Sequence, residues 1–268
     1  NILPFPTFIN KQKINSIGIT SFSIKETLQS LNKSKIVLFG SGFLILSAPH
    51  TEKVERPGET HLAETNLKKI LMRLEKKLGK DKVSTITWKR SKTKKSSKSK
   101  KKSNDKQKTS KKKMDPNYFP KNKLDKSIWY KFMKKKLEQA KKEKKQHKLF
   151  LVDLHGMNND KPFDIIIGFE ALKKYLPKEK SRKIIANIIE VMERLKIKYK
   201  LKIGYNIIFK GFINENYYTV SQQSNSLGIP AIQIEMSRRV REKLVTRETF
   251  FTNFARTLNN LYKLNKAV

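Results

Sequence analysis

This sequence of 268 residues contains no cysteine. Disulfide bonds, thiolate metal ligands and cysteine nucleophiles are therefore excluded, so a metal ion would have to be held by histidine and carboxylate side chains. No apolar stretch approaches the ~20 residues that a membrane-spanning helix needs. The first thirty residues lack the basic and apolar pattern of a signal peptide. Together these absences favour a cytoplasmic protein.

Acidic residues are scarce: 23 Asp and Glu stand against 61 Lys and Arg, a formal net charge of +38. A basic surface attracts anions such as nucleic acid, anionic lipid or acidic peptide. The excess is lysine, with 51 Lys and only 10 Arg, whereas proteins that recognise bases depend on arginine forks and aromatic platforms. We therefore keep nucleic acid as an alternative ligand and do not favour it.

Apolar runs that alternate with helical patterns predict an α/β fold. Strand-like runs cover residues 34–40, 42–50, 83–88, 149–156, 164–168, 201–209 and 229–235. Apolar residues recur with the helical period over residues 64–78, 125–147, 180–195 and 237–264. This alternation predicts a three-layer α/β/α fold with a mostly parallel or mixed sheet. In such folds the ligand lies outside the carboxyl ends of the strands.

Residues 90–113 are nearly all Lys, Ser, Thr, Asn, Asp and Gln. Such a segment cannot bury enough apolar area to offset the entropy lost on ordering. We interpret it as a disordered, lysine-rich insertion, followed by a basic helical segment at about residues 121–148. The expected organisation is thus a single domain over residues 1–268 that these two segments interrupt.

The four histidines differ in their surroundings. His147 lies in a lysine-rich helix end, which is typical of a solvated side chain, and His61 follows no strand-like run. His50 and His155 each follow a buried-looking strand, where an imidazole is an unusual choice for packing alone. A third such strand ends at Glu235. These three side chains predict a shared site at the strand ends, although a hydrogen-bonded histidine at the sheet rim is the alternative interpretation of each.

Several motifs follow one another in a suggestive order. They are Ala48-Pro-His50, Arg56-Pro-Gly58-Glu59, Ala63-Glu64, Asp153-Leu-His155-Gly156 and Gln233-Ile-Glu235-Met-Ser-Arg238. This order resembles the N-formylglutamate amidohydrolase family and its relatives, the poly-γ-glutamate hydrolases and the zinc carboxypeptidases. The resemblance covers roughly residues 35–80 and 148–262 and leaves out the lysine-rich segment.

The resemblance implies a zinc-carboxypeptidase-like (phosphorylase/hydrolase-like) fold and a zinc-dependent hydrolase. Its reaction would be cleavage of a C–N amide bond in a small acidic or glutamyl substrate. His50 and His155 match the two imidazole ligands of the family. Glu64 matches the acidic ligand, because the helical period begins there, with Glu55 or Glu59 as alternatives.

Further roles follow from the same resemblance. Glu235 matches the general base, and Arg56 and Arg238 match positions that could bind a substrate carboxylate. Asp153 lies two residues before His155, hence on the same strand face, where it could orient that ligand. A catalytically inactive basic protein of the same fold, binding nucleic acid or anionic surfaces, is the alternative function.

We predict that deleting residues 90–113 leaves the fold intact, because this tract contributes no apolar area to a core. Thermal unfolding of the deletion variant beside the full chain checks this. The expected shift in midpoint is under about 2 °C, which for a chain of this size corresponds to less than about 1 kcal/mol. A large loss of thermal stability would show instead that the tract is structural.

Overall fold

The computed structural model describes residues 36–89 and 113–265. The segment that we interpret as an insertion lies outside the described residues, apart from Lys113. The carbonyl of Lys113 accepts a hydrogen bond from the N–H of Glu55 at 2.8 Å. This residue is therefore part of the folded structure, and the insertion is better bounded at residue 112.

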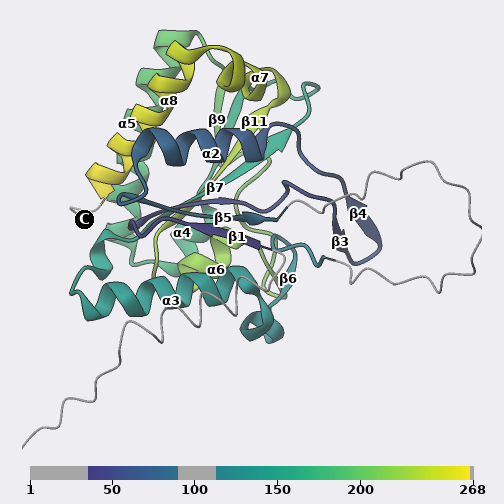
Figure 1. The fold of residues 1–268 in the computed structure, drawn as a ribbon, viewed down its shortest axis with the longest axis vertical. Coiled ribbons are helices and arrows are strands. Elements are labelled where there is room, and N and C mark those ends of the chain that lie inside the picture. Colours follow the sequence, from purple (N-terminus) through teal and green to yellow (C-terminus); the bar gives the residue numbers. More distant parts are fainter. Residues whose placement is uncertain (1–35, 90–112, 266–268) are drawn as a thin grey trace, which may run out of the picture. The chain divides into compact units, whose positions relative to one another are not determined.

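Seven strands form one mixed sheet in the order β1-β5-β2-β7-β11-β8-β9 (Figure 1). They are β1 (Ile36–Phe39), β2 (Leu44–Ala48), β5 (Val83–Trp88), β7 (Phe150–Met157), β8 (Ile165–Gly168), β9 (Ile203–Tyr205) and β11 (Ala231–Ser237). The central strands β5, β2, β7 and β11 are parallel to one another. Strand β1 is antiparallel to β5 and β8 is antiparallel to β11, while β8 and β9 are parallel.

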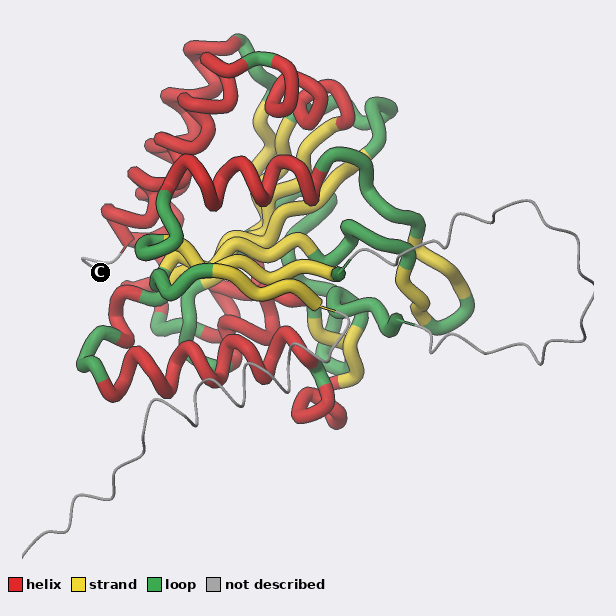
Figure 2. Tube along the Cα trace, viewed as in Figure 1, coloured by secondary structure: helices red, strands yellow, loops and turns green. Residues whose placement is uncertain are grey.

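Helices cover both faces of this sheet, as Figures 1 and 2 show. One layer contains α2 (Leu67–Leu78), α5 (Lys178–Tyr199), α7 (Arg238–Thr246) and α8 (Glu248–Asn265). The other contains α3 (Ile128–Lys142) and α6 (Val220–Ser226), with the short α4 (Glu170–Tyr175) in contact with both α5 and α6. The predicted three-layer α/β/α fold is confirmed.

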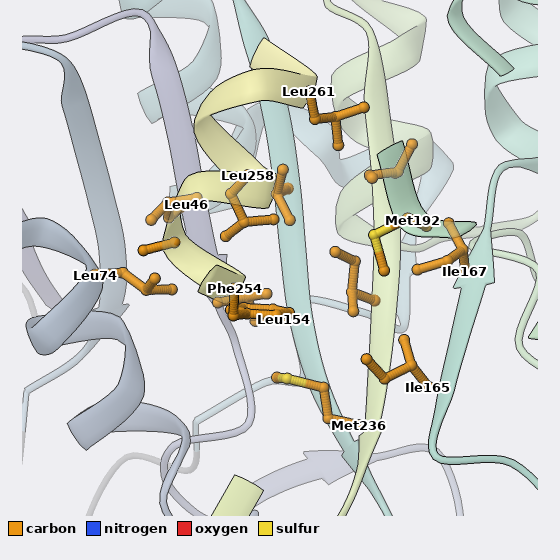
Figure 3. Packing of buried hydrophobic residues seen from close by; sticks show 14 of the residues in the cluster. Leu46, Leu74, Leu154, Ile165, Ile167, Met192, Met236, Phe254, Leu258 and Leu261 are labelled. Carbon is orange, nitrogen blue, oxygen red and sulfur yellow. The ribbon is translucent and has the colours of Figure 1, made fainter. Parts of the chain in front are cut away.

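The side chains of the central strands divide between the two layers with the period of two that a strand imposes. Leu154 of β7 and Met236 of β11 belong to the core beneath α8, where Phe254 and Leu258 pack (Figure 3). Leu151 of β7 lies on the opposite face of the sheet, where it belongs to a second cluster of buried apolar residues. The alternation therefore directs the remaining odd-numbered side chains of β7 and β11 toward the α3–α6 layer.

Some boundaries differ from the sequence-based expectation. The strand expected over residues 201–209 ends at Tyr205, because Asn206 has a left-handed φ of 54° and its N–H donates to Ile167 O at 2.7 Å. The helix expected over residues 237–264 is divided at Arg247, whose backbone is extended. The helix expected from Glu64 begins at Leu67, so that Glu64 lies in the preceding loop.

The sequence patterns did not predict several short elements. The hairpin of β3 (Val54–Arg56) and β4 (Glu59–His61) and the pair of β6 (Phe119–Pro120) and β10 (Tyr217–Tyr218) are too short for a periodic signal. The 3-10 helices η1 (Lys121–Lys126) and η2 (Gln146–Lys148) flank α3. None of the helices in the described part of the chain combines the length and the apolar character that crossing a bilayer requires.

Candidate metal centre

The carboxyl ends of three neighbouring parallel strands bring together the residues singled out in the sequence. His50 follows the end of β2, His155 lies in β7, and Glu235 lies in β11. Glu235 stands directly beside His155 in the register of β11 and β7. The predicted position of these residues, at the carboxyl edge of the sheet, agrees with the structure.

Glu64 joins this group from the loop before α2. Its backbone N–H donates to the carbonyl of His50 at 2.8 Å, and its Oε2 accepts a hydrogen bond from the N–H of Gly156 at 2.7 Å. Its Oε1 lies 2.9 Å from Nδ1 of His50. Glu64 is therefore fixed against both segments that carry the histidines, without being on a helix.

His50, Glu64 and His155 form a group that could hold a metal ion. Nδ1 of His50 lies 3.1 Å from Nδ1 of His155 and 2.9 Å from Oε1 of Glu64, and the remaining pair is 4.0 Å apart. A tetrahedral zinc ion with bonds of about 2.0–2.1 Å places its ligand atoms about 3.3 Å from one another. The separations bracket this value, and two imidazoles with a carboxylate are suitable ligands for zinc, so the donor set fits the ion.

Each imidazole is oriented by a buried carboxylate on its far side. Nε2 of His50 lies 2.9 Å from Oδ1 of Asp115, and Nε2 of His155 lies 2.8 Å from Oδ2 of Asp153. An ionised carboxylate only accepts hydrogen bonds, so the two Nε2 atoms donate to these aspartates, and the two Nδ1 atoms face the side of Glu64, where a bound ion would take their lone pairs. The amide nitrogen of Asn117 also lies 3.0 Å from Nε2 of His155, but it is a hydrogen-bond donor and cannot accept a hydrogen as Asp153 does. The two rings thus turn their Nδ1 atoms, and Glu64 turns a carboxylate oxygen, toward one point where a cation could be held.

The surrounding charges favour a positive charge at this point. Burial by itself would lower the pKa of His50, but Glu64 and Asp115 raise it to about 10. Burial would raise the pKa of Asp115, yet His50 and Arg56 hold it well below its usual range. Arg56 Nε donates to Oδ2 of Asp115 at 2.5 Å. Acidic and basic groups therefore alternate from Arg56 through Asp115 and His50 to Glu64.

Glu235 is buried beside this group. Burial raises the pKa of Glu235 to about 7, although the charge of His155 and a hydrogen bond from Gln233 lower it in part. The Nε2 of Gln233 donates to Oε1 of Glu235 at 2.7 Å. A carboxyl group that titrates near neutral pH is suited to accept and release a proton in a reaction.

A cleft of about 790 Å³ opens over the metal group and Glu235. Its walls include residues of the β3–β4 hairpin, residues 208–213 after β9, and the first turns of α7. Arg56 and Arg238 line it, as the sequence predicts for groups that bind substrate. In the structure Arg56 contacts Asp115 and Glu59, while the exposed Arg238 pairs with Glu242 at 3.0 Å. Their role toward a substrate stays a prediction.

Three residues of the site gave no signal in the sequence analysis. Asp115 belongs to a turn just after the lysine-rich tract, 65 positions from its partner His50. His61 lies in the hairpin, with Nε2 3.1 Å from Oε1 of Glu64 and its ring against that of His50. Arg241 lines the cleft from α7. Of these three residues, only His61 is close in sequence to its partner: it precedes Glu64 by three residues, and this spacing was the one local sign of their contact.

No family model matches the sequence, and no curated protein matches it. Similar solved structures include a bacteriophage poly-gamma-glutamate hydrolase and an N-formylglutamate amidohydrolase from Ralstonia eutropha. Both are 11% identical with a TM-score of 0.44, and both alignments cover 87% of this chain, with 93% and 96% of the respective structures. A gene product of Agrobacterium tumefaciens is 10% identical with a TM-score of 0.47, covering 89% of this chain and 96% of that one. At these values the similarities assign neither a family nor an activity.

We predict that Glu64→Gln abolishes stoichiometric zinc binding, whereas Glu55→Gln and Glu59→Gln retain about one zinc per chain. The charged oxygen of Glu64 lies in the group, while Glu55 accepts from Thr60 and Glu59 contacts Arg56. Metal analysis after dialysis measures the zinc content, with His155→Ala as the metal-free reference. If Glu64→Gln kept its zinc and Glu55→Gln lost it, Glu55 would be the acidic ligand instead of Glu64.

We also predict that Asp115→Asn weakens zinc binding about 10- to 100-fold, the range found when the partner of a ligating histidine is removed. The asparagine amide no longer requires the tautomer that directs Nδ1 of His50 toward the ion. Competition with a chromophoric chelator measures the affinity. Asp125→Asn, in η1, is the matched control and is expected to leave it unchanged. Equal affinities in both variants would contradict a role of Asp115 in orienting His50.

Proposed function

We propose that this protein is a zinc-dependent hydrolase that cleaves a C–N amide bond of a small acidic or glutamyl substrate. The observation that carries the proposal is the convergence of two imidazole nitrogens and one carboxylate oxygen beside a second, buried carboxyl group. Three protein ligands with room for a further one are typical of catalytic zinc sites, whereas structural sites have four protein ligands.

His50, Glu64 and His155 are the residues that would hold the ion. When bound, zinc supplies Lewis acidity, which polarises the scissile carbonyl and makes water easier to deprotonate. Asp115 and Asp153 keep the two imidazoles in the required tautomer, and the N–H of Gly156 keeps Glu64 in place.

Glu235 is our proposed general base. It accepts the proton of the water that attacks the carbonyl carbon, and it then donates this proton to the leaving nitrogen, so that the C–N bond breaks. A pKa near 7 suits both steps, because the group is ready to gain and to lose a proton at neutral pH. Gln233 holds the carboxyl group in one orientation through its hydrogen bond.

Arg56 and Arg238 are the groups that we propose attract the acidic substrate. Nη1 of Arg56 contacts Glu59, whose side chain is 63% exposed, so a substrate carboxylate can replace it at little cost. The exposed pair of Arg238 and Glu242 is open to the same exchange. Both arginines keep a positive charge at the cleft wall in either state.

The alternative is an inactive protein of the same fold that binds nucleic acid or another anionic surface. Exposed lysines on α3 support it, among them Lys131, Lys134 and Lys141. The two functions differ in their metal content and in their response to salt. Protein without zinc that binds nucleic acid in a strongly salt-dependent manner would favour the alternative.

We predict that Glu235→Gln retains about one zinc per chain and lowers kcat by about 10²- to 10⁴-fold, the usual contribution of a positioned base. A screen of N-acyl-glutamate and glutamyl-peptide substrates supplies the assay, and metal analysis supplies the zinc content. Glu190→Gln, on the exposed side of α5 outside the cleft, is the matched control and keeps full activity. Unchanged turnover in Glu235→Gln would remove the assigned base.

A further inference from the structure

Exposed apolar side chains gather in the cleft over the metal group. Within residues 36–89 and 113–265, nine large apolar side chains are exposed, and three of them line this cleft. They are Leu62 with 72% of its surface exposed, Ile208 with 50% and Ile213 with 38%. Single exposed apolar residues are ordinary, but several of them in one concave site indicate a surface that binds a ligand.

Three aromatic residues extend this group. Tyr118, Phe209 and Phe212 line the same cleft and are each partly exposed. The ring of Tyr118 stacks on that of Tyr217 with 4.4 Å between the ring centroids, so its position is fixed. We call the six residues together the apolar wall; they are Leu62, Tyr118, Ile208, Phe209, Phe212 and Ile213.

The segment between β9 and β10 that carries four of these residues is held in place through its backbone. The carbonyl of Gly211 accepts a hydrogen bond from Oγ1 of Thr219 at 2.8 Å. The N–H of Ile213 donates to Oε1 of Gln222 at 3.0 Å. These bonds fix the segment without burying the side chains of Ile208 and Ile213, which stay exposed.

The apolar wall lies close to the groups that would carry out the reaction. Gly211 has a left-handed φ of 68°, and a Cβ added there would lie 3.3 Å from Cβ of Gln233, the residue that donates to the proposed base. Tyr118 directly follows Asn117, whose amide nitrogen lies 3.0 Å from Nε2 of His155. A substrate at the metal group is therefore within reach of the wall.

The size of the cleft fits an apolar group of several carbons. Its volume of about 790 Å³ lies in the range of pockets that enclose a drug-sized ligand. A formyl group has no methylene and would leave the wall in water, whereas a longer acyl group would remove apolar surface from water on both sides. Since the acidic part of the substrate is assigned to Arg56 and Arg238, the acyl group is the part left for the wall.

We propose that the apolar wall binds the acyl group of the substrate, and that the protein prefers amides of medium-length aliphatic or aromatic acids to formyl and other short acyl amides. This inference rests on the proposed hydrolase function and specifies the part of the substrate that the function leaves open. Ile208 and Ile213 are the residues that determine this preference, because they are the most exposed members of the segment between β9 and β10 that line the cleft.

The test compares the zinc-loaded full chain with Ile208→Asn, Ile213→Asn and the control Ile207→Asn. Ile207 belongs to the same segment and is 47% exposed but lies outside the cleft, so its variant matches both the substitution and the exposure. The substrates are N-formyl-, N-butyryl-, N-octanoyl- and N-phenylacetylglutamate. Calorimetry on the zinc-free proteins at several temperatures measures binding without turnover, and burial of apolar surface gives a negative change in heat capacity.

We expect kcat/KM of the wild type to be about tenfold or more higher for the octanoyl than for the formyl substrate, since each buried methylene contributes about three- to fourfold. Ile208→Asn should lose about tenfold on the octanoyl substrate and less than about twofold on the formyl substrate, because only the longer group contacts the wall. Ile213→Asn should change in the same direction, while Ile207→Asn matches the wild type. The heat-capacity change on binding N-octanoylglutamate should be smaller in Ile208→Asn than in the wild type.

Equal kcat/KM for all acyl groups, or equal losses in Ile207→Asn and Ile208→Asn, would overturn the assignment. It would also fail if sedimentation showed a dimer that Ile208→Asn separates, because a second copy of the chain would then cover the wall. If no substrate is hydrolysed but N-octanoylglutamate binds more tightly than N-formylglutamate through Ile208, the hydrolase proposal fails and the acyl site stands. If all substrates are hydrolysed equally well, the reverse holds.

Discussion

The orientation of two imidazole rings is the constraint on which the rest of this site depends. Asp115 and Asp153 accept from the Nε2 atoms, so both Nδ1 atoms face the carboxylate of Glu64. If either ring turned over, its Nδ1 atom would no longer lie at the place where the three atoms meet. The two aspartates therefore decide whether the group can hold a cation at all.

These hydrogen bonds belong to a buried network in which acidic and basic side chains alternate. Arg56, Asp115, His50 and Glu64 follow one another, and each has a partner of opposite character. Such a network is stable in a medium of low polarity only when its members are satisfied. Among the described residues around the cleft, Nε of Arg241, Oε1 of Gln233 and Oδ1 of Asp153 have no hydrogen-bond partner.

Local patterns in the sequence located the strand ends and the faces of the strands. The apolar runs before His50, His155 and Glu235 predicted strands, and their parallel arrangement in the order β2-β7-β11 brings the three residues to one edge. The period of two placed Asp153 on the same face as His155, where its Oδ2 lies 2.8 Å from Nε2 of that ring. Glu64 became a candidate through its place in a family pattern, although the helix expected to carry it begins three residues later.

The sequence by itself determined the layered α/β fold and which strand residues face the cleft, because strands and helices leave periodic patterns within a few residues of chain. Only the tertiary structure decided the remainder of the site. Asp115 reaches His50 across 65 positions, and Arg241 reaches Thr65 across 176. Both come from segments whose position is fixed by packing against distant parts of the chain. No local period records such contacts, so these residues could be recognised only when the chain was folded.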